Sequence, residues 1–564
     1  MHHIAEVEVM TQISIAITGL ALDDKANQTK LGKHDGCRIM AQAIHQHTNS
    51  SLLAENASSA IAALGNHSDT NLAEFALYGT SAGAALMLKV HSKNPIVAAA
   101  VSKACRVLAH NEANRVQLAG AGVVLTAFEI LSSHMAADVV ENCAWLLGTI
   151  TSIPSDELTF GNVVPLNFYT NPKTWSLFEA SLQLHAQQDG PAACLCLAVA
   201  NFADNSCISN VRLCDRLMSL YKQNAKTPQA PYILFAIGAL SAGNNDNQQR
   251  FVKGGMVETV GAVMLEEAQP SRHLAFGHGV LRAIAGLTHN SESIQNQFFK
   301  VKNMRRALSA YMHQHMNDAL IIEWGCKAIV ALAVGHNGNK SLLSVAAEWL
   351  GTECLRMHGN NRKVLSSMLE AISVLCRCHV GNRSVFGSAG ACHNICLVFN
   401  AWVLVDEHVA QLCCRTVANL AANHPNNQLK LSNGDIVTTL MTVLTHYGVD
   451  RSDTVSDDIT KARSINTMKW GLWALGNMLV RSVSLVKHAL SKSPASPGKS
   501  PGPPGLRGNK DELKEFIRYT HIDGYELCEK LHKVLMAFAD SAPVLQWGCR
   551  CVRIICRLGN ANQS

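Results

Sequence analysis

The chain has 564 residues, of which 48% are hydrophobic and 16% charged, and its net charge of +6 is spread without a dense Lys/Arg block, so nucleic-acid binding is not expected. Its nineteen cysteines, Cys194 and Cys196 among them, fall in apolar helix-like runs, which indicates small buried hydrophobes in a reducing compartment rather than a disulfide scaffold. No apolar run reaches the roughly 18 residues of a membrane span, and the N-terminus lacks the pattern of a signal peptide. We therefore expect a soluble, cytoplasmic protein, although the residues leave a cytoskeletal, ciliary or nuclear location open.

A short pattern recurs along the chain every 37 to 49 residues. An apolar run ends in an Asn-rich stretch, then Asn followed by Gln or Arg, then Gly about eight positions later. The clear copies are Asn27-Gln28 with Gly36, Asn114-Arg115 with Gly122, Asn247-Gln248 with Gly255, Asn382-Arg383 with Gly390 and Asn427-Gln428 with Gly434, and weaker copies begin at Asn71, Asn162, Asn210, Asn296 and Asn339. Such a period is typical of all-helical solenoid repeats, each of which buries its apolar face only against its neighbours.

In chain order, the repeats are expected to fill residues 1–489, with an irregular unit at Ser152–Thr174, where two prolines interrupt the helical pattern. Residues 383–422 predict one whole repeat: a short helix ending near Gly387 and Gly390, a second helix, the N-cap Asp406 and an apolar third helix. Residues 450–458 predict an acidic surface loop.

The segment 490–510, rich in Ser, Pro, Gly and Lys, predicts a disordered loop, and residues 511–564 predict a last repeat whose third helix acts as a cap. Ser493, Ser496 and Ser500 in this loop each precede Pro, so we expect phosphorylation there, with an unmodified linker as the alternative.

The repeat resembles the armadillo repeat, most clearly at residues 416–437 (TVANLAANHPNNQLKLSNGDIV), 238–257 (GALSAGNNDNQQRFVKGGMV) and 473–478 (WALGNM). The resemblance implies an all-α, right-handed superhelical solenoid of about 10–12 three-helix repeats, whose third helices line a groove that binds proteins. It also implies a non-enzymatic scaffold or adaptor. A regulator or chaperone of a small GTPase is the alternative, since long armadillo arrays serve that role too.

Residues four apart share one helix face, so one pair in each third helix should line the groove. The basic members of this ladder favour a partner segment that is extended and acidic or phosphorylated, although Lys and Arg that simply solvate the surface are the alternative. The predicted groove residues are Lys103, Trp145, Asn201, Phe235, Arg282, Lys327, Arg415, Asn419, Trp473, Asn477 and Arg550, and Glu370 is the acidic member of the ladder.

Nuclear-import receptors carry Trp-x-x-x-Asn in most repeats, whereas here only Trp473 with Asn477 matches fully. Cargo carriage to the nucleus is therefore the less favoured alternative. Trp324, Trp470 and Trp547 each precede Gly at the start of a third helix, and we interpret them mainly as packing residues that let the neighbouring repeat approach.

No motif for catalysis or for a cofactor is found, so an enzyme is not expected. One cluster has the short Cys/His spacing of a zinc site, but its first cysteine lies where other repeats have core residues, and a metal is not expected. Its members are Cys376, Cys378, His379, Cys392, His393 and Cys396. Four histidines at the ends of third helices are expected to cap carbonyl groups or to interact favourably with the negative end of the helix: His110, His289, His336 and His424.

Overall fold

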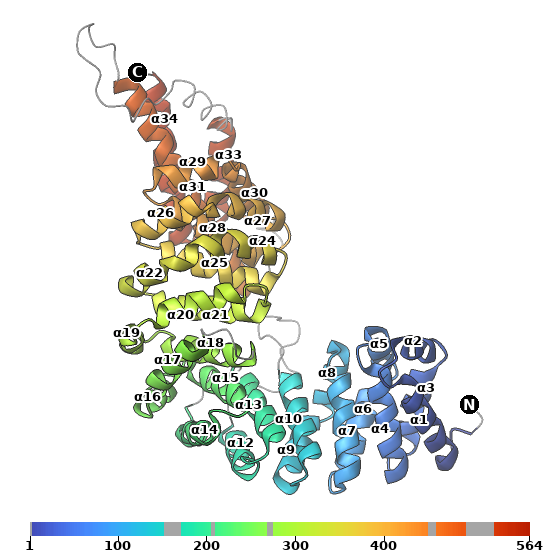
Figure 1. Ribbon diagram of the computed structural model, residues 1–564. Coiled ribbons are helices and arrows are strands. Elements are labelled where there is room, and N and C mark those ends of the chain that lie inside the picture. The colour runs from blue at the N-terminus through green and yellow to red at the C-terminus, as the bar shows by residue number, and fades with distance from the viewer. Residues whose placement is uncertain are drawn as a thin grey trace. The chain divides into compact units, whose positions relative to one another are not determined.

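The computed structural model describes residues 3–151, 171–204, 209–267, 274–448, 458–491 and 524–563. Within these ranges all regular structure is helical, in successive repeats of up to three helices (Figure 1). The predicted all-α fold of stacked helical repeats is thus confirmed for the described residues. The chain divides into two compact units: Met1–Val263 with Gln269–Ile294 form the first unit, and Met264–Ala268 with Gln295–Ser564 form the second.

In the first unit, the third helices form a continuous row in which each packs against the next. They are α1 (Val7–Ala21), α4 (Ser51–Gly65), α7 (Pro95–Leu108), α10 (Ala137–Thr151), α13 (Asp189–Asp204), α15 (Ala230–Ser241) and α18 (Leu274–Thr288). The short first helices are α2 (Lys25–Lys33), α5 (Asp69–Leu77), α8 (Glu112–Gly120) and α16 (Asn245–Lys253). The second helices are α3 (Gly36–Gln46), α6 (Thr80–Val90), α9 (Val123–Ser133), α12 (Pro172–Leu184), α14 (Val211–Asn224) and α17 (Met256–Glu267), whose last four residues are assigned to the second unit.

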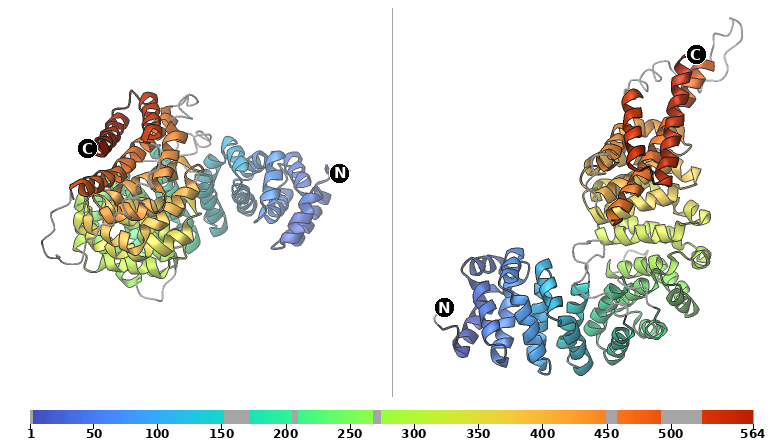
Figure 2. Two further views of the ribbon diagram at one scale, coloured as in Figure 1. Left: turned by 90° about the horizontal axis from the view of Figure 1, so that it is seen from above. Right: turned by 180° about the vertical axis from the view of Figure 1, so that it is seen from behind.

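The second unit, coloured from yellow-green to red in Figure 2, repeats this plan, and each of its third helices packs against the next. Its third helices are α21 (Ala319–Ala333), α25 (Arg362–Cys376), α28 (Glu407–Ala421), α31 (Asp458–Ser491) and α34 (Ala542–Gln563). The first helices are α19 (Glu292–Lys300), which crosses the boundary between the units, α22 (Asn337–Leu343), α26 (Val380–Ala389) and α29 (Pro425–Ser432). The second helices are α20 (Met304–Gln314), α27 (Ala391–Trp402), α30 (Ile436–Gly448) and α33 (Gly524–Ala537).

One second helix of this unit is broken into pieces. A 3-10 turn (Ser344–Ala346) leads into α23 (Ala347–Trp349), a π turn (Leu350–Cys354) and α24 (Leu355–His358). The expected helices of residues 383–422 correspond to α26, α27 and α28, and Asp406 caps α28 by accepting a hydrogen bond from the Val409 amide. This part of the sequence prediction is confirmed. Most of the three segments predicted to be irregular or loops, 152–174, 450–458 and 490–510, lies outside the described residues. Where they are described the prediction is wrong, because residues 172–174 begin α12, Asp458 begins α31 and residues 490–491 end it.

The recurring asparagine joins adjacent repeats through backbone carbonyls. The Asn427 side-chain amide donates to Leu420 O at 3.1 Å, at the end of its own third helix, and to Arg383 O at 2.9 Å, in the preceding repeat. Asn71 and Asn382 make the same two bonds in their repeats. Leu420 lies in the last turn of α28, where a helix leaves carbonyls unpaired, and a carbonyl buried without a donor is costly. Arg383 lies inside α26, so there the amide adds a second donor to a helical carbonyl.

The residue after this asparagine reaches in the other direction. Gln428 donates to Ala421 O at 2.8 Å and to Asn477 O at 3.0 Å, and Asn477 belongs to the next repeat. Arg383 does the same with a guanidinium, to Cys376 O and Ala422 O. In these two repeats the dipeptide therefore ties the repeat to both neighbours, which accounts for its recurrence. We call this arrangement the Asn-Gln bracket.

Histidines at the ends of third helices do not cap carbonyls in the second unit, which corrects the sequence prediction for His336 and His424. Instead, the Nδ1 atoms of His336 and His424 accept from the backbone amides of Asn339 and Asn427, so these rings cap the N-terminus of the following first helix. His379 does the same for α26. An accepting Nδ1 requires an unprotonated nitrogen.

Acidification is therefore expected to destabilise the second unit. Burial lowers the pKa of His379 and of His424 below the ordinary 6.5. Because these folded-state pKa values are lowered, the stability they contribute is full above about pH 6.5 and is lost as the pH falls towards the folded-state values. Urea unfolding at pH 7.5 and 5.5 measures this loss.

The matched control replaces both rings by asparagine, which caps helices without titrating. The double variant His379→Asn/His424→Asn should lose less stability on acidification than the parent, while His408, whose pKa burial also lowers, keeps its own contribution. An identical pH response of parent and variant would contradict the role given to these two rings.

The glycine of the repeat pattern has two different uses. Gly390 lies at φ +99° between α26 and α27, a backbone conformation that glycine adopts without strain. In the next repeat the positive φ, +57°, falls on Asp435, one residue after Gly434 of the pattern. Gly387 instead permits a close approach, since a Cβ there would lie 1.8 Å from the Asn427 Oδ1 atom of the bracket.

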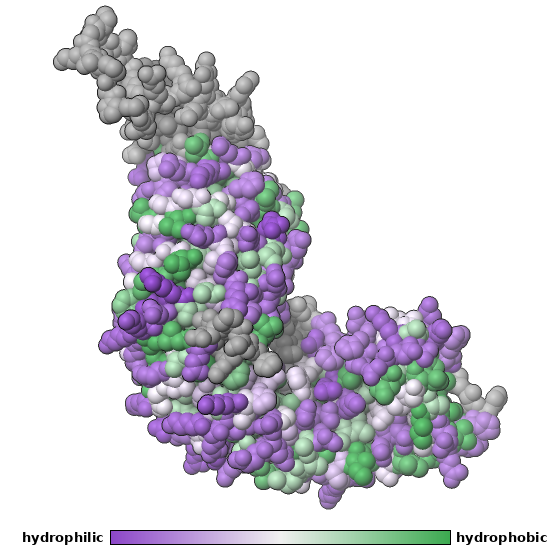
Figure 3. All heavy atoms as spheres, viewed as in Figure 1, coloured by the Kyte–Doolittle hydropathy of each residue, from purple (hydrophilic) through white to green (hydrophobic). Residues whose placement is uncertain are grey.

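No single helix in the described ranges combines the length and apolar character needed to cross a membrane. One bent pair, α8 with α9, meets the criterion by length and composition alone. Hydrophobic side chains also reach the surface of the N-terminal repeats among hydrophilic ones (Figure 3), and these include Leu20, Leu52, Leu77 and Ile96.

Candidate functional site

Three tryptophans of the second unit form a stacked column on the third helices α31 and α34. The rings of Trp470 and Trp473 lie 4.8 Å apart and 17° from parallel, and those of Trp473 and Trp547 lie 4.7 Å apart and 14° from parallel. All three side chains are half-buried. Trp470 and Trp473 are three residues apart on α31 and so share a face, and packing of α34 against α31 adds the third ring. We call these three residues the tryptophan column.

Cations lie at both ends of the tryptophan column. The Arg415 guanidinium lies 5.5 Å from the Trp470 ring centre and the Lys469 ammonium also 5.5 Å from it, while the Arg550 guanidinium lies 5.0 Å from the Trp547 ring. Cations at such distances from a ring face are attracted by its negative charge density. A hollow of about 420 Å³ beside this second end is lined by Gln546, Trp547, Cys549, Arg550 and Arg553.

The acceptors of these two arginines are poorly placed. Arg415 Nη1 lies 3.5 Å from Glu370 Oε1, and the buried Arg415 Nε has no hydrogen-bond partner. Arg550 Nη2 lies 3.5 Å from Asn477 Oδ1. By contrast, Arg250 in the first unit binds both oxygens of Asp215 at 2.6 Å. Strong guanidinium–carboxylate pairs are short and bidentate, so both ends of the tryptophan column retain unused donor capacity.

Two predicted groove asparagines are buried within the array instead of facing a groove. Asn419 is 2% exposed and donates to Ser373 Oγ at 2.8 Å, and Asn477 is 5% exposed and donates to Ala418 O at 2.9 Å. Their amides serve contacts between repeats. The single complete Trp-x-x-x-Asn match therefore has its amide occupied and both faces of its Trp473 ring covered.

Lys327 lies on α21, apart from the tryptophan column. Its ammonium pairs with Glu323 at 2.6 Å, one helical turn earlier, and lies 4.2 Å from the Trp324 ring. The side chain remains 40% exposed, so it can still meet a partner.

In the first unit, the predicted residues are spread over separate third helices. Lys103 and Trp145 are exposed on α7 and α10, and Asn201 donates to Gly148 O at 2.9 Å. Arg282 is 3% exposed, which corrects its expected place on the groove surface. Its guanidinium pairs with Asp204 at 2.5 Å and covers the Phe235 ring at 3.8 Å.

The sequence favoured a packing role for Trp470 and Trp547, and their stacking with Trp473 was therefore missed. The glycine after each also acts differently from expectation. A Cβ at Gly471 would meet Leu444 at 3.2 Å, and one at Gly548 would meet Leu535 at 2.3 Å. These leucines belong to second helices of the same repeats, so the glycines let that helix approach, not the neighbouring repeat. The recurrence of Trp-Gly at the start of third helices was the feature of the sequence that could have pointed to the tryptophan column.

The other predicted sites contribute nothing further to this surface. Ser493, Ser496 and Ser500 lie outside the described residues. Of the cysteines weighed as zinc ligands, Cys376, Cys392 and Cys396 are buried, and burial raises the pKa of Cys392 to about 11 and that of Cys396 to about 12. A buried thiol with a raised pKa behaves as a packing residue.

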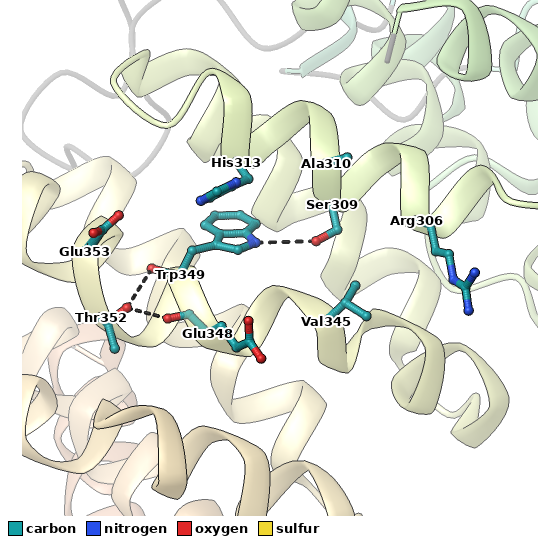
Figure 4. A pocket seen from close by; sticks show the side chains of 9 residues that line it. All are labelled: Arg306, Ser309, Ala310, His313, Val345, Glu348, Trp349, Thr352 and Glu353. Carbon is teal, nitrogen blue, oxygen red and sulfur yellow. Dashed lines mark hydrogen bonds between the residues drawn. The ribbon is translucent and has the colours of Figure 1, made fainter. Parts of the chain in front are cut away.

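A second hollow, of about 490 Å³, lies between α20 and the broken helix that contains the π turn (Figure 4). Its floor is the buried Trp349, whose indole donates to Ser309 Oγ at 3.4 Å. Its remaining lining residues are Arg306, Ala310, His313, Val345, Glu348, Thr352 and Glu353. Because both signs of charge line it, its chemistry favours no single class of ligand, and the tryptophan column remains the better candidate.

Comparison with known proteins returned matches among solved structures alone: no protein-family profile and no curated protein matches the chain. A structure from work on a phosphorylation switch that controls the interaction between cadherin and β-catenin is 12% identical and covers 84% of this chain and 94% of that one, with a TM-score of 0.43. A designed armadillo repeat protein is 16% identical and covers 46% of this chain and 99% of its own, with a TM-score of 0.35. These values are too low to carry an argument, so the fold assignment rests on the chain's own helix order and contacts.

Proposed function

We propose that this chain is a non-enzymatic scaffold or adaptor that binds extended segments of partner proteins bearing Asp, Glu or phosphate. The binding surface is formed by the third helices of the second unit. The observation that carries the proposal is the pair of arginines at the ends of the tryptophan column, each with a single long contact of 3.5 Å to its acceptor. Large aromatic side chains and arginines are the residues that dominate binding energy at protein interfaces.

The charges of this surface support an acidic partner. Lys469 shares the Trp470 end of the tryptophan column with Arg415, and the exposed Arg553 lines the same hollow as Arg550. Of the acidic side chains that contact these residues or α31, Glu370 makes only a long contact with Arg415, and Glu407 is buried and accepts from Ser464 and Thr467. Complementary charge steers a partner to such a surface and fixes its register.

Carriage of a basic cargo in the manner of nuclear-import receptors is less well supported. That mode places lysine stems between tryptophan faces and holds the cargo backbone with asparagine amides. Here the faces within the tryptophan column are covered and the Asn477 amide is occupied. Co-purification with a basic-signal cargo, or with a nucleotide-free small GTPase, would replace the present proposal by one of its alternatives.

Charge reversal tests the proposal directly. The full-length triple variant Lys327→Glu/Arg415→Glu/Arg550→Glu should bind a labelled Asp/Glu-rich peptide at least about tenfold more weakly than the parent, because charge-assisted hydrogen bonds are replaced by repulsion. Fluorescence anisotropy at physiological salt measures the affinity, and circular dichroism checks that folding is intact.

A control variant makes the same change in net charge elsewhere. Lys30, Lys33 and Lys253 are exposed on first helices of the first unit, and their replacement by Glu should leave binding within about twofold, apart from screened long-range effects. Equal losses in the two triple variants would show non-specific attraction. Unchanged binding by the Lys327→Glu/Arg415→Glu/Arg550→Glu variant would show that the peptide does not bind to this surface of the second unit.

A further inference from the structure

The tryptophan column presents ring edges to a partner. Trp473 is covered on both faces by Trp470 and Trp547, and the outer faces of those two rings are covered by Arg415 and Arg550. The edge of an aromatic ring is its electropositive part. Within the described residues no acceptor binds the three indole N–H groups, unlike those of Trp349 and Trp402, which donate to Ser309 and Gly359. The exposed rim thus offers hydrogen-bond donors and positive potential.

The length of the tryptophan column limits the spacing of the groups it can recognise. Each step from Arg415 through the three rings to Arg550 is 4.7 to 5.5 Å, so the two guanidinium carbons lie at most about 20 Å apart. An extended chain advances about 3.3–3.6 Å per residue, so about six residues span that distance. Side chains alternate along an extended chain, and an even spacing places two of them on one face.

We propose that the tryptophan column binds an extended partner segment that carries two carboxylates four or six residues apart, one for Arg415 and one for Arg550, with uncharged residues between them. This inference rests on the proposed function and adds the spacing and the mode of recognition. The rings act as a rigid rail whose edges and N–H groups receive the intervening backbone carbonyls. Because no ring face is free, a lysine-rich segment finds neither a stacking site nor a complementary charge.

Glu370 occupies the place of one of the two carboxylates. Its contact with Arg415 is long and single, its own side chain is 42% exposed, and Arg415 is 20% exposed. A weak intramolecular pair of this kind is displaced when a better acceptor arrives. Glu370 therefore competes with the partner, and its removal strengthens binding.

The experiment uses the full-length protein and synthetic fluorescein-labelled peptides of about thirteen residues on a Ser/Thr/Gly background. Two glutamates stand four, five or six positions apart, and a single-glutamate peptide and a two-lysine peptide complete the set. The spacings of four and six should bind about tenfold more tightly than the single glutamate, while the spacing of five falls between. The two-lysine peptide should not bind measurably.

Variants locate the two carboxylates on the surface. Arg415→Ala and Arg550→Ala should each reduce the affinity of the best two-glutamate peptide about tenfold. The affinity of the single-glutamate peptide should be nearly unaffected by Arg550→Ala. Glu370→Gln, which keeps the side-chain shape, should tighten binding up to about fivefold. Arg250→Ala, a paired arginine of the first unit, should change nothing.

The outcomes separate this inference from the proposed function. If acidic peptides bind and the triple charge reversal abolishes binding, but all spacings bind equally, the scaffold proposal stands and the two-carboxylate rail is wrong. If the two-lysine peptide binds more tightly than the two-glutamate peptides, the proposed recognition of two carboxylates is wrong. It is also wrong if acidic peptides bind the Glu370→Gln variant more weakly than the parent. Absence of binding by every acidic peptide would overturn both.

Discussion

Replacing Gly286 by alanine is expected to destabilise the first unit by about 3 kcal/mol, the upper end of the usual cost of overpacking. Gly286 lies on α18, and a Cβ there would lie 1.8 Å from the carbonyl oxygen of Gly238 on α15. The obstacle is backbone, so no side chain can rotate away and the two helices must separate. Hydrogen exchange of the α15 and α18 amides, with urea unfolding of the whole chain, measures the effect.

Gly19 provides a matched control on a third helix of the same unit. It lies within α1, and a Cβ there would meet no atom within 4 Å. Gly19→Ala should therefore stabilise that helix by up to about 1 kcal/mol, since alanine loses less backbone freedom on folding. Equal exchange rates in the parent and the Gly286→Ala variant would show that α15 and α18 are not in direct backbone contact.

Replacing Asn427 by alanine is expected to cost about 2–4 kcal/mol in the second unit. The side chain is 1% exposed, and its loss leaves the carbonyls of Arg383 and Leu420 buried without their donors. Water cannot readily replace the amide at so buried a position. Chemical denaturation followed by circular dichroism gives the free energy of unfolding, and exchange at α26 and α29 locates the loss.

Asn433→Ala is the control for this substitution, because Asn433 is exposed six residues further along the same repeat. Its replacement should change stability by less than about 0.5 kcal/mol. A small effect of Asn427→Ala, comparable with that of Asn433→Ala, would mean that the bracket is not an energetic link between repeats.

Much of the fold could be predicted from the sequence because the residues that form the Asn-Gln bracket lie close together in the sequence. Asn427 and Gln428 stand seven residues after the carbonyls that end their own third helix, so the pattern that makes the bonds is also the pattern that repeats. The helix order of residues 380–421 follows from it. The different roles of Gly390, which has a positive φ, and Gly387, which permits a close approach, could not be predicted. They depend on the backbone conformation of each glycine and on the atoms that lie next to it.

The candidate site was predictable only in part. The helix periodicity placed Arg415, Trp473 and Arg550 on third helices, and the structure brings these three together. Helix periodicity could not show that Trp473 stacks on Trp547, which is 74 residues away in the sequence. Arg282 was placed on the surface because its spacing matched the ladder, yet the close approach of α15 and α18 at their glycines buries it against Phe235. Side-chain burial at such a contact depends on the distance between helices, which periodicity does not encode.

The Asn-Gln bracket also has a consequence for the order in which a nascent chain becomes stable. The asparagine arm reaches back to a segment already synthesised, about 43 residues earlier, and can form as soon as its repeat emerges from the ribosome. The glutamine arm waits for carbonyls 35 to 49 residues ahead. Each newly made repeat can thus bond at once to the preceding repeat, but its remaining bonds form only when the next repeat has been synthesised. During translation, the last repeat with all of its bracket bonds is therefore one repeat behind the most recently synthesised one.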